Sequence, residues 1–380
     1  MEMLTEHAKE RLERQQYRVV GSHSAVKICG WTKNMIKGKG GCYKLKFYGI
    51  MSNQCMQMTP SMSCANRCSF CWRDYKAPVS KEWKWDVDEP EGILEESMEQ
   101  HHKLLEGFNG NPNVIRPAYL ASKNIKHVAL SLNGEPITYP KMNALLDEYH
   151  KRGISTFLVT NGQHPAQVEA LNPVTQLYIS VDAPNKTLLK EIDNPLYEDY
   201  WEKLHQSLDS LAKKQQRTTI RLTVMQGYND VEPESYAKLI LRGDADFVEI
   251  KGYMHVGASQ GRLSRDTMPE HDYVVSFARQ VEKYLPGYEM MSEHIPSRVV
   301  CLAKKSFQKE GLWHTWIDFD TFAELILTGE PFTTADYMKK TPSNLVGIKS
   351  EKKVVEAEAI VDETQSFVKV SEEGREEDLD

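Results

Sequence analysis

The chain has 380 residues, of which 40% are hydrophobic and 27% are charged, values that are typical of a globular protein. It is long enough for one large α/β domain of the barrel type or for two medium-sized domains. The N-terminal segment lacks the apolar core of a signal peptide, and no stretch approaches the roughly 20 apolar residues that a membrane-spanning helix needs. We therefore expect a cytoplasmic protein that does not enter a membrane.

The formal net charge of −7 is unevenly distributed. Residues 1–80 contain 13 Lys or Arg and 5 acidic residues, whereas residues 351–380 contain 4 basic and 11 acidic residues. The basic part indicates a surface for a polyanion, although unpatterned surface charge would give the same count. Its candidate contacts are Arg11, Arg14, Arg18, Lys33, Lys37 and Lys39. The acidic, aromatic-poor end predicts a disordered tail over residues 336–380.

The elements predicted in chain order are a first helix within residues 1–20 and then a regular alternation of strands and helices. Short runs rich in Val, Ile, Leu, Thr or Phe predict strands at 54–59, 127–132, 155–160, 176–181, 218–225 and 247–251. Amphipathic stretches predict crossover helices at 91–108, 139–153, 184–194 and 200–215. This rhythm predicts an α/β fold, a partial (βα)6 barrel of the TIM type, with ligand sites at the carboxyl ends of the strands. A doubly wound open sheet would produce a similar rhythm.

The predicted barrel, residues 54–258, has an extension on each side. Residues 1–53 form a basic N-terminal extension that carries three cysteines. Residues 259–335 are predicted to pack on the barrel, with a helix at 272–285 and strands at 295–305 and 313–319. The acidic tail follows.

Three cysteines, Cys64, Cys68 and Cys71, are closely spaced in the stretch SCANRCSFCW. Thiolates are soft ligands that suit zinc and iron–sulfur clusters, and structural zinc sites are closed by four ligands. Three thiolates can hold three irons of a four-iron cluster and leave the fourth iron open. A zinc site completed by a distant His is the alternative.

A second set, Cys29, Cys42 and Cys55, has twelve residues between successive cysteines, a spacing too wide for the CxxC knuckles of zinc ribbons. These thiols are either buried core residues or ligands of a second cluster with an open iron. Lys44 follows Cys42 by two residues. A lysine whose amine is deprotonated by burial or nearby cations can form a Schiff base with a carbonyl substrate, although most lysines in a basic stretch are simply exposed.

The Cys64-x3-Cys68-x2-Cys71 motif, with Phe70 before its last cysteine, resembles the signature of radical S-adenosylmethionine (SAM) enzymes. The resemblance implies a [4Fe-4S] cluster whose open iron binds SAM, and a 5′-deoxyadenosyl radical formed by reductive cleavage. Turns after the predicted strands match the superfamily's cofactor contacts, although ordinary turn chemistry would select the same residues. The cofactor-binding residues implied in this way are Phe70, Asn133, Gly134, Glu135, Asn161, Ser180 and Asp182. The sequence departs from the superfamily's Gly-Gly-Glu motif at Asn133.

The six clustered cysteines together with Lys44 resemble the archaeal-type tRNA 4-demethylwyosine synthases, over the chain up to about residue 335. This resemblance implies a tRNA-modifying lyase of wyosine biosynthesis that condenses N1-methylguanosine-37 of tRNA(Phe) with pyruvate. It also implies a second, auxiliary [4Fe-4S] cluster at Cys29, Cys42 and Cys55. Pyruvate would be held by that cluster or by an imine on the catalytic Lys44, and the residues do not decide between the two.

Eukaryotic relatives carry a flavodoxin-like domain in front of the barrel, whereas this chain begins with one short predicted helix. We therefore expect an external electron donor such as a flavodoxin or a ferredoxin, and a monomer. Two other classes remain open. One is a radical SAM enzyme with an auxiliary cluster that acts on a protein or a small molecule, and the other is a zinc-binding RNA module without enzymatic activity.

Overall fold

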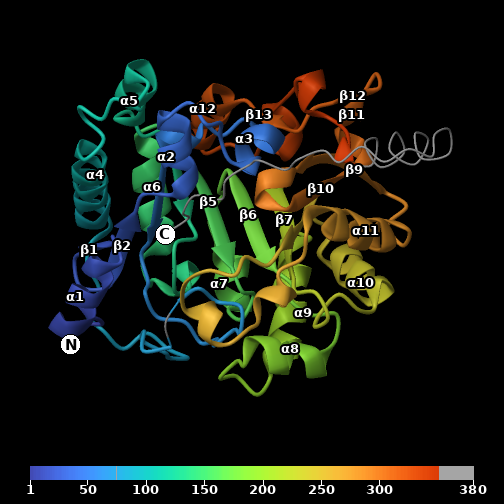
Figure 1. Ribbon diagram of the computed structural model, residues 1–380, viewed down its shortest axis with the longest axis horizontal. Helices are drawn as coiled ribbons and strands as arrows, with labels where there is room; N and C mark the ends of the chain where they lie inside the picture. The colour runs from blue at the N-terminus through green and yellow to red at the C-terminus, as the bar shows by residue number, and fades with distance from the viewer. Residues whose placement is uncertain (74, 351–380) are drawn as a thin grey trace, which may run out of the picture.

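The computed structural model describes residues 1–73 and 75–350. In this part of the chain ten strands form one curved sheet in the order β1-β2-β3-β4-β5-β6-β7-β8-β10-β9, with helices covering its convex side (Figure 1). The strands of this sheet are β1 (Arg18–Val20), β2 (Ser24–Lys27), β3 (Cys55–Thr59), β4 (His127–Leu130), β5 (Ser155–Thr160), β6 (Gln176–Ser180), β7 (Arg217–Val224), β8 (Phe247–Gly252), β9 (Tyr288–His294) and β10 (Val299–Lys304). Two further short antiparallel pairs are formed by β11 (Gln308–Lys309) with β12 (Leu312–Trp313), and by β13 (Trp316–Ile317) with β14 (Met338–Lys339).

Helices connect the strands and pack against the sheet. They are α1 (Glu6–Arg14), α2 (Gly30–Ile36), α3 (Tyr43–Tyr48), α4 (Pro90–Glu106), α5 (Arg116–Ser122), α6 (Met142–Lys151), α7 (Pro165–Ala170), α8 (Lys186–Asp193), α9 (Tyr200–Leu211), α10 (Pro233–Gly243), α11 (His271–Glu282) and α12 (Phe319–Thr328). The four predicted crossover helices correspond to α4, α6, α8 and α9.

The six predicted strands are confirmed as β3 to β8, which pair in parallel and in chain order. A doubly wound sheet would reverse its strand order at a switch point, and this sheet does not. β1 and β9 form the edges, so the sheet is an open, partial barrel. Antiparallel β2 extends it before β3, and antiparallel β10 extends it after β8.

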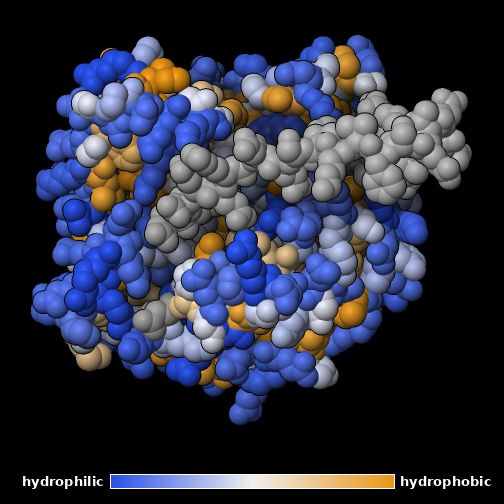
Figure 2. Space-filling view, viewed as in Figure 1, coloured by the Kyte–Doolittle hydropathy of each residue, from blue (hydrophilic) through white to orange (hydrophobic). Residues whose placement is uncertain are grey.

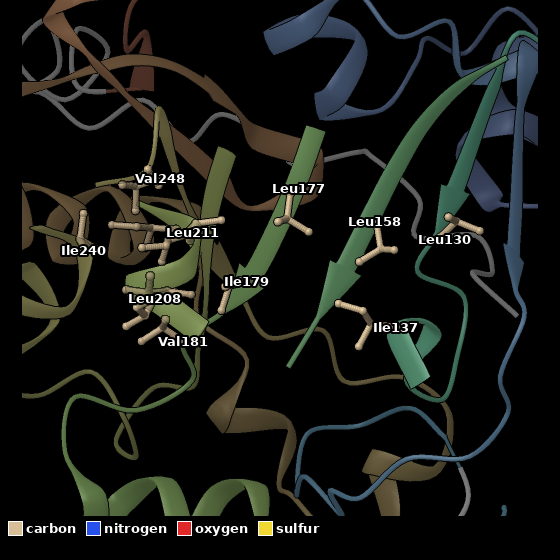
Figure 3. Close-up of a cluster of buried hydrophobic side chains, with 14 of the residues drawn as sticks. Leu130, Ile137, Leu158, Leu177, Ile179, Val181, Leu208, Leu211, Ile240 and Val248 are labelled. Carbon is tan, nitrogen blue, oxygen red and sulfur yellow. The ribbon is translucent and has the colours of Figure 1, made fainter. Parts of the chain in front are cut away.

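Alternating side chains of the parallel strands divide the core into two parts. Leu158, Leu177, Ile179 and Val248 belong to the cluster between the sheet and its outer helices, where Leu208 of α9 meets them (Figure 3). The intervening residues point to the concave side. There, aromatic residues of α3 pack against the strands in a second cluster that includes Tyr43, Phe47, Tyr48, Phe157, Tyr178 and Phe247. One end of the concave face is thereby filled, because α3 packs into it.

Three expectations need correction. The N-terminal helix ends at Arg14, because the chain turns into β1, which pairs with β2. The predicted strand at 313–319 is replaced by β12 and β13, which are separate and belong to different pairs. The expected tail from residue 336 begins too early, since β14 and a 3₁₀ turn at Ser343–Leu345 are regular elements. The rest of the predicted tail, 351–380, lies outside the described residues.

Among the described residues, no helix combines the length and the apolar character needed to cross a bilayer. The face drawn in Figure 2 is mostly hydrophilic, with hydrophobic residues in small separate groups.

Candidate active site

The first cysteine group lies in the loop that follows the carboxyl end of β3. Cys64, Cys68 and Cys71 are partly buried and form no disulfide. Burial raises the pKa of Cys64 to about 12, and burial and the neighbouring Asp193 carboxyl raise that of Cys68. A metal that binds these thiols as thiolates therefore has to displace their protons.

Two arginines hold the loop that carries these thiols. Arg73 is buried, and its guanidinium donates hydrogen bonds to the carbonyls of Met62 (3.1 Å) and Asn66 (3.4 Å). Arg262 donates to the carbonyl of Ser69 (2.9 Å) and to that of Cys71. Side chains thus satisfy several of the loop's carbonyls, which have no partner in a helix or a strand.

The turn after β4 packs directly on the cysteine loop. Gly134 has φ +66°, and a Cβ at this position would lie 1.9 Å from the carbonyl oxygen of Ser61, so no other residue fits. The next residue, Glu135, donates its backbone N–H to Ser63 O (2.8 Å). The Asn133 side chain accepts from the Gly134 amide (2.9 Å) and therefore stabilises the turn itself.

Glu135 and Asn161 join the turn after β4 to the turn after β5. Glu135 Oε2 accepts a hydrogen bond from the backbone N–H of Asn161 at 3.0 Å. The side-chain Nδ2 of Asn161 lies 3.6 Å from Cys64 Sγ. Burial raises the pKa of Glu135 to about 7. Its other oxygen, Oε1, is buried without a hydrogen-bond partner in the part of the chain that the structure describes. An orphaned acceptor beside Cys64 is suited to a ligand with an amino group.

The structure places the remaining sequence-predicted residues around the same edge. Asp182 is buried just beyond β6, and burial raises its pKa to about 6. It acts electrostatically on Cys68, so this turn also borders the cysteine loop. Ser180 ends β6 and is partly exposed. Phe70 packs against the main hydrophobic cluster, which makes it at least in part a core residue.

The second cysteine group gathers at the opposite end of β3. Cys29 precedes α2, Cys42 precedes α3, and Cys55 begins β3. The three thiols are near neighbours, because Cys42 and Cys29 both add to the effect of burial in raising the pKa of Cys55 to about 12. Ser52 supports the group: its Oγ accepts from the Cys42 amide (2.9 Å) and lies 3.3 Å from Cys42 Sγ.

The side chain of Lys44 points from α3 to the concave face of the sheet. Its Nζ lies 4.4 Å from the centre of the Tyr178 ring and 5.7 Å from that of Phe157. Burial lowers the pKa of Lys44; the carboxyl group of Glu249 opposes this shift and the Arg221 cation adds to it. The amine is thus held among aromatic rings with its neutral form favoured, as nucleophilic attack requires.

Sequence reasoning missed the charged residues of the concave face, Arg221 and Glu249. They occupy directly opposed positions on β7 and β8. The signal was present in the alternation of RTTIRLTV and FVEIKG, where polar residues take every second position. Richness in apolar residues alone predicts strands that are buried on both faces, whereas this alternation indicates one apolar face and one polar face.

The arrangement of the two cysteine groups limits the kind of metal centre that they can hold. Within residues 1–73 and 75–350, no three His, Cys, Asp or Glu side chains are grouped closely enough to hold a single metal ion. A four-iron cluster makes a different demand, because each thiolate binds a different iron and the thiols stand farther apart. Two sets of three partly buried, unpaired thiols, one of them beside the orphaned Glu135 oxygen, fit such clusters.

Family profiles match the chain in two consecutive segments: the Radical SAM superfamily over residues 58–240, and Wyosine base formation over residues 242–304. The chain is therefore a radical SAM protein, a class that uses SAM and a [4Fe-4S] cluster. The first segment runs from the end of β3 through β7 and includes the Cys64 group, and the second contains β8 to β10.

Solved structures define the family more narrowly. "Structure of TYW1 with a lysine-pyruvate adduct bound" matches with a TM-score of 0.72 and 36% identity, covering 80% of this chain and 97% of the other. "Crystal structure of archaeal TYW1" matches with a TM-score of 0.66 and 33% identity, covering 81% and 99%. The chain belongs to the TYW1 family.

A curated relative from Oryza sativa subsp. japonica, S-adenosyl-L-methionine-dependent tRNA 4-demethylwyosine synthase, is 49% identical over 345 residues. The match covers 90% of this chain and 53% of the relative. The chain thus spans about half the length of the curated relatives it matches.

Proposed function

We propose that this chain is a tRNA 4-demethylwyosine synthase, a lyase that condenses N1-methylguanosine-37 of tRNA(Phe) with pyruvate in wyosine biosynthesis. One observation carries the proposal. Lys44, with the second cysteine group beside it, faces the concave side of the same partial barrel whose carboxyl edge bears the Cys64 group. A radical SAM site and an amine suited to a carbonyl substrate therefore share one interior.

Cys64, Cys68 and Cys71 would hold the cluster of the radical site, and Glu135 Oε1 would accept from the amino group of SAM. When bound, the cluster supplies the electron that cleaves SAM to a carbon radical. Asn161, Ser180 and Asp182 border the space in which the rest of SAM would lie. Cys29, Cys42 and Cys55 would hold an auxiliary [4Fe-4S] cluster, as the three-thiol count at each site supports.

Lys44 is the proposed anchor for pyruvate. Its nitrogen would bond to the carbonyl carbon, and the carbonyl oxygen would leave as water. The lysine–pyruvate adduct named for the related TYW1 structure supports this assignment, as does the burial that lowers the pKa of Lys44. Access of pyruvate to the neighbouring cluster is compatible with it, because Lys44 also lies close to Cys42 and Cys55.

The proposed partners follow from the same reaction. The tRNA would meet the basic surface of α1, β1 and α2, which carries Arg14, Arg18, Lys33 and Lys37. A base in an anticodon loop is easier to extrude than one in a duplex. A flavodoxin or a ferredoxin would supply electrons to a monomer in the cytoplasm.

An anaerobic assay tests the proposal with the protein loaded with iron and sulfide, tRNA(Phe) methylated at N1 of G37, SAM, pyruvate and a chemical reductant. We expect mass spectrometry to show that the nucleoside at position 37 changes in mass from N1-methylguanosine to 4-demethylwyosine. The matched control is the same tRNA without the methyl group, which should stay unchanged. Formation of 5′-deoxyadenosine without any change in the nucleoside would contradict the proposal and favour a protein or small-molecule substrate.

A further inference from the structure

We propose that Arg221 binds the carboxylate of the carbon donor, so that the interior of the barrel selects a 2-oxo acid over a neutral ketone or ester. This inference rests on the proposed function, because it assigns the part of the same site that recognises the acid group of pyruvate. Arg221 would be a specificity-determining residue next to the proposed nucleophile Lys44.

The strand register puts Arg221 on the concave face. On β7 it lies opposite Ser180 of β6 and opposite Glu249 of β8. Its neighbours along the strand, Ile220 and Leu222, belong to the cluster under the outer helices. Because side chains alternate along a strand, Arg221 points the other way, into the interior.

Lys44 reaches the same place from a different element. Its Nζ lies over the ring of Tyr178, the β6 residue that comes two positions before Ser180 and shares its face. Arg221 and Glu249 are the two strand residues whose charges act most strongly on Lys44. The amine and the guanidinium therefore converge on one region, although they come from α3 and β7.

Arg221 lies among charged and polar groups on the concave face. The carboxyl groups that act on it are those of Glu249 and Asp182, and its guanidinium also interacts with the hydroxyl group of Tyr43. Arg221 is only partly buried. Its guanidinium has five N–H donors, so it can also bind a carboxylate that enters the interior.

One oxygen of Glu249 is bound to α3. Its Oε1 accepts a hydrogen bond from Tyr48 OH at 2.9 Å, which ties it to α3. Burial raises the pKa of Glu249, while the cations of Lys44 and Arg221 oppose the shift. The other oxygen, Oε2, has no hydrogen-bond partner among the described residues, so Glu249 acts on Lys44 and Arg221 through its charge.

The chemistry of a 2-oxo acid fits this arrangement. Its carboxylate is attached directly to the carbonyl carbon that Lys44 would attack, so an acid-binding group has to lie close to the amine. A guanidinium binds a carboxylate through two parallel hydrogen bonds and stays charged at any physiological pH. Lys251 lies two positions after Glu249 on β8, but burial lowers its pKa to about 8 and it offers no planar pair of donors.

The test measures binding of radiolabelled pyruvate to anaerobically reconstituted protein by equilibrium dialysis. We expect Arg221→Gln to raise the Kd for pyruvate by about 10- to 100-fold, the range for loss of a charged hydrogen bond. Arg221→Lys should fall between this variant and the wild type. Arg242→Gln is the matched control, because Arg242 pairs with Asp209 on the outer helices, and it should bind pyruvate as the wild type does.

A second measurement separates recognition of the acid from a general effect on structure. Competition with methyl pyruvate, which lacks the negative charge, should show a strong preference for pyruvate in the wild type and little preference in Arg221→Gln. If Arg221→Gln does not fold, Arg221→Lys must still show a reduced preference. Unchanged affinity for pyruvate in Arg221→Gln, or equal loss of affinity for pyruvate and its ester, would overturn the proposal.

The two proposals fail in different ways. A wild type that binds pyruvate and discriminates against its ester, but leaves the methylated tRNA unchanged, would contradict the proposed function and support the role of Arg221. If the wild type modifies the tRNA but the Arg221→Gln variant binds pyruvate normally, the proposed function is supported and the role of Arg221 is overturned.

Discussion

Glu135 and Asn161 are joined by a hydrogen bond of 3.0 Å from the Asn161 amide to Glu135 Oε2. This bond holds the Glu135 carboxylate between the turns that follow β4 and β5. Its Oε1 stays buried and unpartnered among the described residues. Asn161 in turn lies next to Cys64. The proposed SAM contact is thus aligned by the backbone of a neighbouring turn, which restricts how the carboxylate can move.

Replacing Glu135 with Gln should weaken SAM binding by about tenfold to a hundredfold, because a charged acceptor for the amino group is lost. Equilibrium dialysis of SAM against anaerobically reconstituted protein measures this effect, and the iron content should stay unchanged. Glu99→Gln on the outer face of α4, where Glu99 pairs with Lys103, is the control. Equal SAM affinity in the two variants would remove Glu135 from the SAM site.

Gly134→Ala should destabilise the fold by more than the usual cost of a side chain at positive φ, which exceeds about 1 kcal/mol. The added Cβ would also lie 1.9 Å from Ser61 O, so the turn has to move away from the cysteine loop. Gly153→Ala is the matched control, since Gly153 has φ +65° but no atom within 4 Å of the added Cβ. Urea unfolding measures the loss of unfolding free energy in each variant. Similar losses in the two variants would show that the turn can move away from Ser61 at little cost.

The sequence predicted the elements of the barrel better than its interior. The six parallel strands were recognisable because short apolar runs alternate with amphipathic helices. The polar turns at residues 133–136 and 160–162 also fall at the ends of predicted strands. The packing of α3 into the concave face could not be predicted, since no local pattern tells which strands an aromatic helix will contact. The same tertiary contact brings Lys44 to Arg221 and Glu249. Likewise, the support of the cysteine loop by Arg262 joins residues about 190 positions apart.

Iron analysis should separate one cluster from two. Reconstituted wild type is expected to contain about eight irons per chain, and simultaneous replacement of Cys29, Cys42 and Cys55 by Ala should leave about four. Cys301→Ala is the control: this thiol is fully buried against Tyr48, belongs to neither group and should not affect iron content. About four irons in wild type and triple variant alike would contradict the auxiliary cluster.

Glu293 links Lys349 and Ser350, the last described residues, to the sheet. Its Oε1 accepts from the amides of Lys349 (2.7 Å) and Ser350 (2.9 Å), and its Oε2 lies 2.9 Å from His271 Nε2. Burial alone would raise the pKa of Glu293, but these hydrogen bonds outweigh burial and lower the pKa to about 2. The carboxylate therefore stabilises the fold in its ionised form.

The pH dependence of stability follows from this shift. Because the pKa of Glu293 is lower in the folded state than the ordinary value of 4.5, its contribution is complete above pH 4.5 and is lost as the pH falls toward 2. The contribution is on the order of 3 kcal/mol. Urea unfolding between pH 3 and pH 7 should show Glu293→Gln less stable than the wild type at pH 7, with the difference shrinking as the pH falls. Glu289→Gln, an exposed position on the same strand, should follow the wild type at every pH. A deficit of Glu293→Gln that stays constant down to pH 3 would mean that the side chain acts through packing and not through its charge.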